Sequence, residues 1–439
     1  MKRGILYTFL AQAPALFLYF LASTLMTRML GDVGRGEYTL ITNHVALLNL
    51  VLGMNIGFGI IVFISKPSSD HAAVIGTATT LLLFNIVAVP FILFAIDRSF
   101  LREAMMPDQR LHWTYWAFIY ISVIAGFINS SVSAILLGLK KFGVLNWMSV
   151  LNAGLSALGF LTIFLIRDEA ILVDAFPAVI GVSSIAMVII SLAWCLLYAL
   201  HVRIPPVPVW KWSVISPILS FSLVGHLSNL INLINYRFDV WVVDRYQGAA
   251  ELGLYAVAVG LGQLLFNVPE PFSRVVQPYL FGQVKNEMLH RFKAVARLNF
   301  TALSVLAVGL ALIAHWIVPL LFGPAFQPSV IPLQLLLPGI VLSGATKLLS
   351  QLVTHGGLQR YNLIATASAA LLTIILDLVL IPRWGMHGAA IATTCSYSLV
   401  LLIILYVIRW RMNIPIQDLF LLRPSDIAAL KRHLPWPSR

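Results

Sequence analysis

Six ionisable side chains lie inside apolar stretches of the sequence, where a charge is costly. They are three cations and three carboxylic acids: Arg237, Arg274, Lys347, Asp239, Glu270 and Asp377. A charged side chain at the centre of a membrane span costs about 2.5–3.5 kcal/mol, so it is retained where it faces water, a partner or a ligand. We therefore treat these six residues as candidate functional residues.

The three cations suit an anionic ligand. An arginine guanidinium can make two parallel hydrogen bonds to one phosphate group, and a lysine ammonium supplies a compact positive charge. We predict that Arg237, Arg274 and Lys347 line a water-filled cavity and bind the phosphate of a substrate. In the alternative interpretation, Arg237, Lys347 and Asp377 lie near the ends of their apolar stretches, and their side chains extend toward the lipid headgroups.

The three carboxylic acids are candidates for coupling transport to an ion gradient. A carboxylate inside a membrane can bind and release a proton or a sodium ion, so Asp239, Glu270 or Asp377 could connect transport to a proton or sodium gradient. Glu270 has a second interpretation, because Arg274 follows it by four residues and lies on the same helix face. These two residues could form a purely structural ion pair.

The sequence contains none of the patterns that are typical of enzymes or of cofactor binding. It lacks a nucleophile motif, a phosphate-binding P-loop, a dinucleotide-binding glycine pattern and a metal-ligand cluster. The two cysteines, Cys195 and Cys395, fall in apolar stretches and form no metal motif. We expect no enzymatic activity, no cofactor and no metal, and we do not expect this chain alone to hydrolyse ATP.

The composition predicts a membrane protein. Only 10% of the residues are charged and 59% are hydrophobic, whereas a soluble domain has about 25% charged residues. The net charge of +12 could indicate nucleic-acid binding, but the basic residues lie in short segments between apolar stretches, with no interleaved aromatic residues. We therefore expect no nucleic-acid partner.

About 12 stretches are long and apolar enough to form transmembrane helices. Their approximate bounds are 5–27, 39–64, 72–96, 112–138, 143–166, 171–200, 214–241, 251–283, 296–320, 329–354, 361–382 and 386–408. Lysines between the spans all fall in segments on one side, and that side also has more of the arginines. Lysine and arginine favour the cytoplasmic side, so we predict that both termini are cytoplasmic.

Two short patterns recur at nearly one spacing, which predicts an internal repeat. The pattern R-x-x-G-x4-G-x-Y begins at Arg28 and again at Arg245, and Gly138-Leu-Lys-Lys-Phe resembles Gly357-Leu-Gln-Arg-Tyr. Six spans per half would give both halves the same orientation, as in a parallel repeat. We predict two six-helix bundles, residues 1–210 and 211–410, followed by a basic cytoplasmic tail, residues 411–439.

Three segments carry a resemblance to the polysaccharide-biosynthesis flippases. They are Thr27–Gly31 with Gly36–Tyr38, Asp244–Arg245 with Gly253–Ala258, and Asp377–Thr393. The last resembles a C-terminal pattern of the family, except that Asp377 stands where the family more often has Asn. The resemblance implies membership of the multidrug/oligosaccharidyl-lipid/polysaccharide (MOP) exporter superfamily, with two six-helix bundles around a central cleft and alternating access.

The same resemblance implies a function and its partners. The oligosaccharide branch of the superfamily moves undecaprenyl-diphosphate-linked glycans from the inner to the outer leaflet of the bacterial cytoplasmic membrane. It implies the lipid bilayer, a polysaccharide polymerase and chain-length machinery as further partners.

Three other functions remain open. One is a cation-coupled multidrug exporter of the same superfamily, although many such exporters have a carboxylate in the first span and here no Asp or Glu precedes Asp32. The others are a membrane polymerase or glycosyltransferase, which would usually have a large outer loop, and a scaffold that transports nothing.

Overall fold

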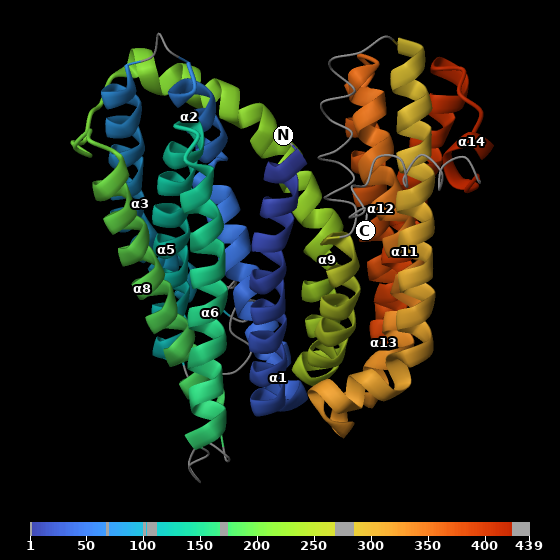
Figure 1. The fold of residues 1–439 in the computed structure, drawn as a ribbon. Helices are drawn as coiled ribbons and strands as arrows, with labels where there is room; N and C mark the ends of the chain where they lie inside the picture. Colours follow the sequence, from blue (N-terminus) through green and yellow to red (C-terminus); the bar gives the residue numbers. More distant parts are fainter. Residues whose placement is uncertain are drawn as a thin grey trace, which may run out of the picture. The chain divides into compact units, whose positions relative to one another are not determined.

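The computed structural model describes residues 2–66, 70–99, 102, 112–166, 174–267 and 285–423, and their regular secondary structure is helical. No strand occurs among them. The elements are α1 (Lys2–Gly53), α2 (Ile56–Ile64), α3 (His71–Asp97), α5 (His112–Gly138), α6 (Phe142–Ile166), α8 (Phe176–His201), α9 (Trp212–Leu264), η2 (Leu265–Asn267), α11 (Lys285–Phe322), η3 (Pro324–Ser329), α12 (Val330–His355), α13 (Gln359–Arg411) and α14 (Gln417–Phe420) (Figure 1).

Nine helices in the described part of the chain are long and apolar enough to cross a membrane. Three of them, α1, α9 and α13, contain a glycine at which the backbone leaves the helical conformation, so each consists of two helical segments. Counting these three helices as two spans each turns nine helices into twelve spans. The predicted all-helical membrane fold is thus confirmed.

The three corners depend on glycine because of their backbone angles. Gly31 has φ 65° and ψ −169°, Gly248 has φ 82° and ψ 177°, and Gly385 has φ 55° and ψ −137°. Positive φ combined with ψ near ±150–180° is a region that glycine alone adopts readily. Gly31 and Gly248 are 217 positions apart (248 minus 31), so they occupy the same place in the predicted repeat.

The contacts divide the chain into two compact units. Unit 1 comprises Met1–Leu233 with Gly248–Gly253, and unit 2 comprises Ile234–Gln247 with Leu254–Arg439. The helix α9 contributes residues to both. The predicted bundle boundary between residues 210 and 211 was inferred from the repeat and stays a prediction.

Unit 1 is held together by apolar contacts between α1, α2, α3, α5, α6 and α8. Buried side chains such as Phe118 and Ile119 of α5 pack with Val89 of α3 and Phe176 of α8. A second cluster joins the start of α9 to α2, where Ile218 and Ile60 are both almost fully buried.

Glycine permits one close approach in unit 1. A Cβ atom on Gly36 would lie 1.7 Å from the carbonyl oxygen of Ala249, and a Cβ atom on Gly253 would lie 1.9 Å from that of Asp32. Ala249 follows Asp32 by 217 positions, and Gly253 follows Gly36 by the same number. The two contacts are therefore reciprocal, which supports the predicted repeat and requires glycine at both positions.

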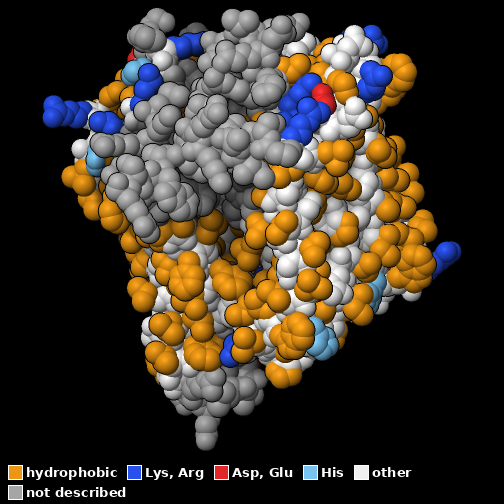
Figure 2. Space-filling view, turned by 45° about the vertical axis from the view of Figure 1, so that its right-hand side comes forward, with side chains coloured by type: hydrophobic (Ala, Val, Ile, Leu, Met, Phe, Trp, Pro, Cys, Tyr) orange, Lys and Arg blue, Asp and Glu red, His pale blue; other side chains and the backbone are white. Residues whose placement is uncertain are grey.

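Unit 2 is built around α12, which packs against α11 and α13. Its buried residues Leu348, Leu352 and Val353 form one cluster with Ile404 and Ile408 of α13. In both units, large apolar side chains stand exposed on the outward faces of helices, for example Phe91 (71% exposed) and Leu312 (69% exposed) (Figure 2). Such a surface suits lipid rather than water, so the chain is a multi-pass membrane protein.

Candidate functional site

Two helices of unit 2 carry a polar residue and an aspartate at the same spacing. On α9, Asn235 precedes Asp239 by four residues, and on α13, Thr373 precedes Asp377 by four residues. Residues four apart lie on one helix face. All four side chains are buried, so each helix presents a hydroxyl or amide group and a carboxyl group to the interior of unit 2.

Hydrogen bonds fix these two helices next to each other and in the same direction. The Thr373 hydroxyl donates to the Asn235 side-chain oxygen at 2.9 Å. Further along both helices, the Gln247 side-chain amide donates to the Ile381 carbonyl oxygen at 3.0 Å. One turn beyond the first bond, Asp239 and Asp377 therefore lie at the same level, close enough to interact electrostatically.

Tyr255 contacts one member of this pair, Asp239. Its hydroxyl donates to Asp239 Oδ2 at 2.5 Å, and the ring is almost fully buried. Tyr255 also has a side-chain hydrogen bond with Thr393. The corner at Gly248 directs the chain back, so that the first turns of the following segment bring Tyr255 to a carboxylate on the preceding segment. We call Asn235, Asp239, Tyr255, Thr373 and Asp377 the carboxylate site.

The carboxyl group of Asp377 is energetically costly, because its side chain is fully buried. Its exposed fraction is 0%, and neither carboxyl oxygen has a hydrogen-bond partner among the described residues. An isolated buried carboxylate costs several kcal/mol or more, so such a group binds a proton or a cation instead. Carboxylate, hydroxyl and amide oxygens are hard ligands that suit a proton or an alkali cation.

The hydroxyl groups of Thr373 and Ser396 extend the carboxylate site to the second segment of α13. The Thr373 hydroxyl lies 2.8 Å from the Ser396 hydroxyl, and both groups are buried. Thr393, which contacts Tyr255, precedes Ser396 by three residues on the second segment of α13. Both segments of α13 therefore contribute side chains to the carboxylate site.

Arg237 lies beside the carboxylate site. It is partly buried, and its charge acts on both Asp239 and Tyr397. The preceding residue, Tyr236, makes an edge-to-face contact with Tyr397 at a ring distance of 5.7 Å and a hydrogen bond with Ser343 of α12. Arg237 therefore lies close enough to Asp239 and Tyr397 to interact with them, and its role as a cavity cation stays a prediction.

Lys347 lies on the same face of α12 as Ser343, one turn away. Its side chain is exposed, and the face continues with further polar residues: Ser350, Gln351 and Thr354. A polar stripe along a membrane helix is expected to face water or polar partners, because lipid cannot solvate it. The Tyr236–Ser343 bond thus joins the helices that carry Arg237 and Lys347.

Glu270 and Arg274 lie outside the described residues. The structure therefore brings together Asp239 and Asp377, places Arg237 beside them, and places Lys347 on an adjacent helix.

The sequence interpretation missed the neutral members of the site. Asn235, Tyr255, Thr373, Thr393 and Ser396 were not predicted as site residues, because neutral polar side chains are common in membrane spans. Asn235 and Thr373 could have been found from their matching positions, four residues before Asp239 and Asp377.

Comparisons with known proteins agree with this fold. The family model for polysaccharide biosynthesis proteins matches residues 1–284. No match was found among the curated protein sequences.

Solved structures share the fold at low sequence identity. A lipid II flippase, MurJ, in an inward closed conformation has a TM-score of 0.75 and 14% identity, covering 94% of this chain and 89% of that chain. An inward-facing multidrug resistance MATE family transporter of the MOP superfamily has a TM-score of 0.70 and 16% identity, covering 95% and 96%. A MOP superfamily transporter from Pyrococcus furiosus has a TM-score of 0.58 and 15% identity, covering 92% and 95%.

These similarities establish the MOP-type helical fold, and the matched family model covers more than half of the chain. The chain therefore belongs to the polysaccharide biosynthesis protein family.

Proposed function

We propose that this protein is a flippase that moves an undecaprenyl-diphosphate-linked oligosaccharide from the inner to the outer leaflet by alternating access. The observation that carries the proposal is the match to the polysaccharide biosynthesis family on a fold shared with a lipid II flippase. The repeat unit of an O-antigen, a capsule or an exopolysaccharide would be the transported glycan. The bacterial cytoplasmic membrane, with both termini cytoplasmic, is the proposed location.

The cations would hold the diphosphate. Arg237 supplies a guanidinium beside the carboxylate site, and Lys347 supplies an ammonium on the polar stripe of α12. Two phosphate groups carry charges that several such cations can share through charge-assisted hydrogen bonds. Arg274 was predicted from the sequence alone to bind the phosphate, and we retain it in this proposal. A polysaccharide polymerase and the chain-length machinery are the proposed protein partners, because they would use the glycan on the outer face.

The carboxylate site would couple this movement to a proton or sodium gradient. Asp377 is buried without a hydrogen-bond partner among the described residues, and Asp239 interacts with it electrostatically. Bringing one cation to this pair relieves the repulsion between two carboxylates and the cost of a buried unpaired charge. Filling and emptying the site could therefore favour different conformations of the protein.

The substrate proposal is tested with purified protein in liposomes that contain a fluorescent undecaprenyl-diphosphate oligosaccharide. We expect Arg237→Gln and Lys347→Gln each to lower the flipping rate at least about tenfold, since each removes a charge-assisted contact of about 1.5–3 kcal/mol. Arg383→Gln, an exposed charge at the corner of α13, should leave the rate unchanged. Equal rates for all three variants and the native protein would contradict the proposed role of the cations.

The coupling proposal is tested in the same liposomes with an imposed proton or sodium gradient. We expect Asp239→Asn and Asp377→Asn to remove the response to the gradient, while Asp244→Asn, on the same helix as Asp239 but outside the carboxylate site, keeps it. A flipping rate that ignores both gradients in the native protein would disprove coupling and leave the flippase proposal intact.

A cation-coupled multidrug exporter is the second candidate function. It is favoured by the fold shared with a MATE family transporter and by the buried carboxylate pair. Cells that express the protein would then survive higher concentrations of cationic drugs, and the liposomes would flip no lipid-linked glycan. A membrane polymerase is the weaker alternative, and it would lengthen the glycan rather than move it.

A further inference from the structure

The segment that follows α13 is held firmly against unit 2. Ile414 and Leu419 are buried in the cluster formed by α11, α12 and α13, and the Phe420 ring meets Phe300 edge-to-face at 4.8 Å. This segment, residues 414–423, includes the short helix α14. Its inner face is thus fixed by apolar contacts, which determines which of its side chains face outward.

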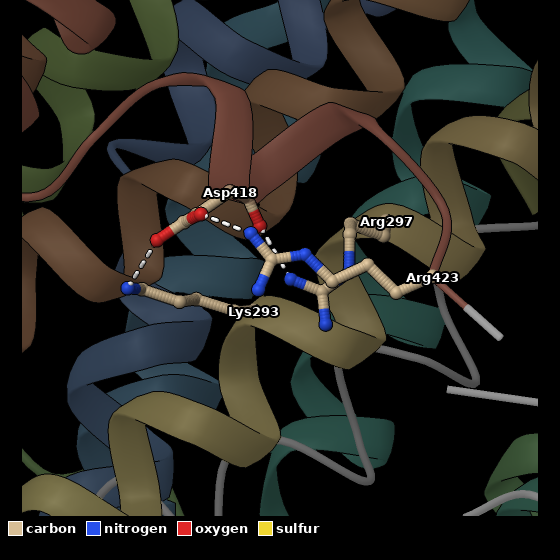
Figure 3. A network of polar contacts seen from close by, with 4 residues as sticks. All are labelled: Lys293, Arg297, Asp418 and Arg423. Atoms are coloured by element: carbon tan, nitrogen blue, oxygen red, sulfur yellow. Dashed lines mark hydrogen bonds and ion pairs between the residues drawn. The ribbon is translucent and has the colours of Figure 1, made fainter. Parts of the chain in front are cut away.

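Asp418 contacts three cations, two of them on α11 and the third, Arg423, in its own segment (Figure 3). Lys293 Nζ donates to Asp418 Oδ2 at 2.8 Å, and Arg297 Nη1 donates to the Asp418 main-chain oxygen at 2.7 Å. Arg423 forms an ion pair with Oδ1 of the same carboxylate. We call Lys293, Arg297, Asp418 and Arg423 the basic cluster.

The four side chains of the basic cluster carry a net positive charge. Three cations surround a single carboxylate, so the cluster carries a surplus of two positive charges (three minus one). The Arg423 side chain is 53% exposed, whereas Arg297 is almost fully buried. Arg423 is therefore the cation of the cluster that a ligand could reach most directly.

The surroundings of the basic cluster are those of a membrane–water boundary. Ile416, Leu421 and Leu422 are exposed on the outer face of the segment, and Tyr406 and Trp410 are exposed near the end of α13. Lys293 and Arg297 lie near the start of the membrane-crossing part of α11, which is Phe292–Phe322. Exposed apolar and aromatic side chains beside cations are typical of segments that lie in the headgroup region.

We propose that the basic cluster and the outer face of residues 414–423 form a binding site for the headgroup of an anionic phospholipid. The phosphate would contact Arg423 and Lys293, while the acyl chains would cover Leu421 and Leu422. Charge complementarity selects an anionic over a zwitterionic lipid, and the exposed apolar side chains select a lipid over a soluble phosphate. Arg297 acts as a positioning residue, because its hydrogen bond to the Asp418 main-chain oxygen holds the segment in place.

The proposal is tested by native mass spectrometry of the full-length protein after incubation with equal amounts of phosphatidylglycerol and phosphatidylcholine. We expect the native protein to retain phosphatidylglycerol preferentially, and Arg423→Gln to weaken this binding about fivefold, the effect of one basic residue at an anionic surface. Arg383→Gln, at the corner of α13, is the matched control and should have no effect. High salt should weaken the binding of the native protein.

Asp418→Asn separates a lipid site from a purely structural clamp. Removal of this carboxylate increases the positive surplus, so a lipid site should bind phosphatidylglycerol at least as well as before. If Asp418→Asn instead weakens the binding as much as Arg423→Gln does, the cluster serves only to dock the segment and the proposal fails. It also fails if Arg423→Gln and Arg383→Gln have the same effect, or if the native protein retains both lipids equally.

Discussion

The two tyrosines of the repeated pattern lie at equivalent places and have different partners. Tyr38 follows the corner at Gly31 in unit 1, and its hydroxyl meets the Ser183 hydroxyl at 3.4 Å. Tyr255 follows the corner at Gly248, and its hydroxyl donates to the Asp239 carboxylate at 2.5 Å in unit 2. The same backbone device therefore supports a long contact between neutral groups in one unit and a short contact to a carboxylate in the other.

The difference extends to the residue that would correspond to Asp239. The offset of 217 positions that relates Gly31 to Gly248 places Ala22 at this point in unit 1, and Ala22 is buried. The repeat has thus kept its glycines and tyrosine, whereas the carboxylate is present in only one of the two places. This comparison indicates that the corners serve folding in both units, whereas the proposed ion chemistry belongs to only one of them.

The largest expected effect concerns Gly36 and Gly253, the glycines that the two halves of the repeat have in common. Gly36→Ala and Gly253→Ala should each cost more than the roughly 1–3 kcal/mol of ordinary overpacking, because the new Cβ would collide with backbone oxygen atoms at 1.7 and 1.9 Å. The measurement is the yield of monodisperse protein in size-exclusion chromatography. Gly181→Ala, where the added Cβ meets no atom within 4 Å, should behave like the native protein.

A smaller and equal effect is expected at the two corners themselves. Gly31→Ala and Gly248→Ala meet no steric barrier, but each forces alanine into a region of backbone angles that costs about 1–3 kcal/mol. Thermal unfolding in detergent should show similar losses for the two variants. A large loss at one corner and none at the other would show that the corners are not equivalent.

The tyrosines should respond unequally. Tyr255→Phe should cost about 1.5–3 kcal/mol, because it removes a hydrogen bond to a charged group, and Tyr38→Phe about 0.5–1.5 kcal/mol. A double-mutant cycle with Asp239→Asn would isolate the energy of the Tyr255–Asp239 contact. If the two single variants lose the same stability, the contrast between the units has no energetic basis.

The smallest effect concerns Asp418, a carboxylate of unit 2 that lies outside the membrane spans. The hydrogen bond from Lys293, together with the charges of Lys293 and Arg423, holds the pKa of the Asp418 carboxyl below its ordinary value of 3.8. The attachment of residues 414–423 should therefore be fully stable above about pH 4 and weaken as the pH falls through the lowered pKa. A spin label at Leu421→Cys would report this as increased mobility in acid, and Asp418→Asn should abolish the pH dependence.

The fold could be predicted because its main requirement is simple. A membrane span needs a long apolar stretch, so the stretches 329–354 and 143–166 closely match α12 and α6. The sequence did not indicate the helix break inside the predicted span 39–64, where Met54 and Asn55 adopt positive φ. Hydropathy reports where a chain is apolar and contains little information on such local backbone angles.

The candidate site could be predicted only where charge made it visible. Asp239 and Asp377 were recognisable because carboxylates are rare in apolar stretches, but their proximity depends on the hydrogen bond between Asn235 and Thr373, which are 138 positions apart. No local pattern reports which two spans will lie next to each other. The direction of the Arg237 and Lys347 side chains was equally hidden, because it depends on the neighbours of α9 and α12.

Asp377 is buried without a hydrogen-bond partner among the described residues, and this has an electrical consequence. If a cation must enter beside this carboxylate before the site closes, each turnover carries at least one elementary charge part of the way across the membrane. A potential of 100 mV then contributes up to about 2.3 kcal/mol to that step. The membrane potential, and not only the ion concentrations, would then determine the transport rate of the protein.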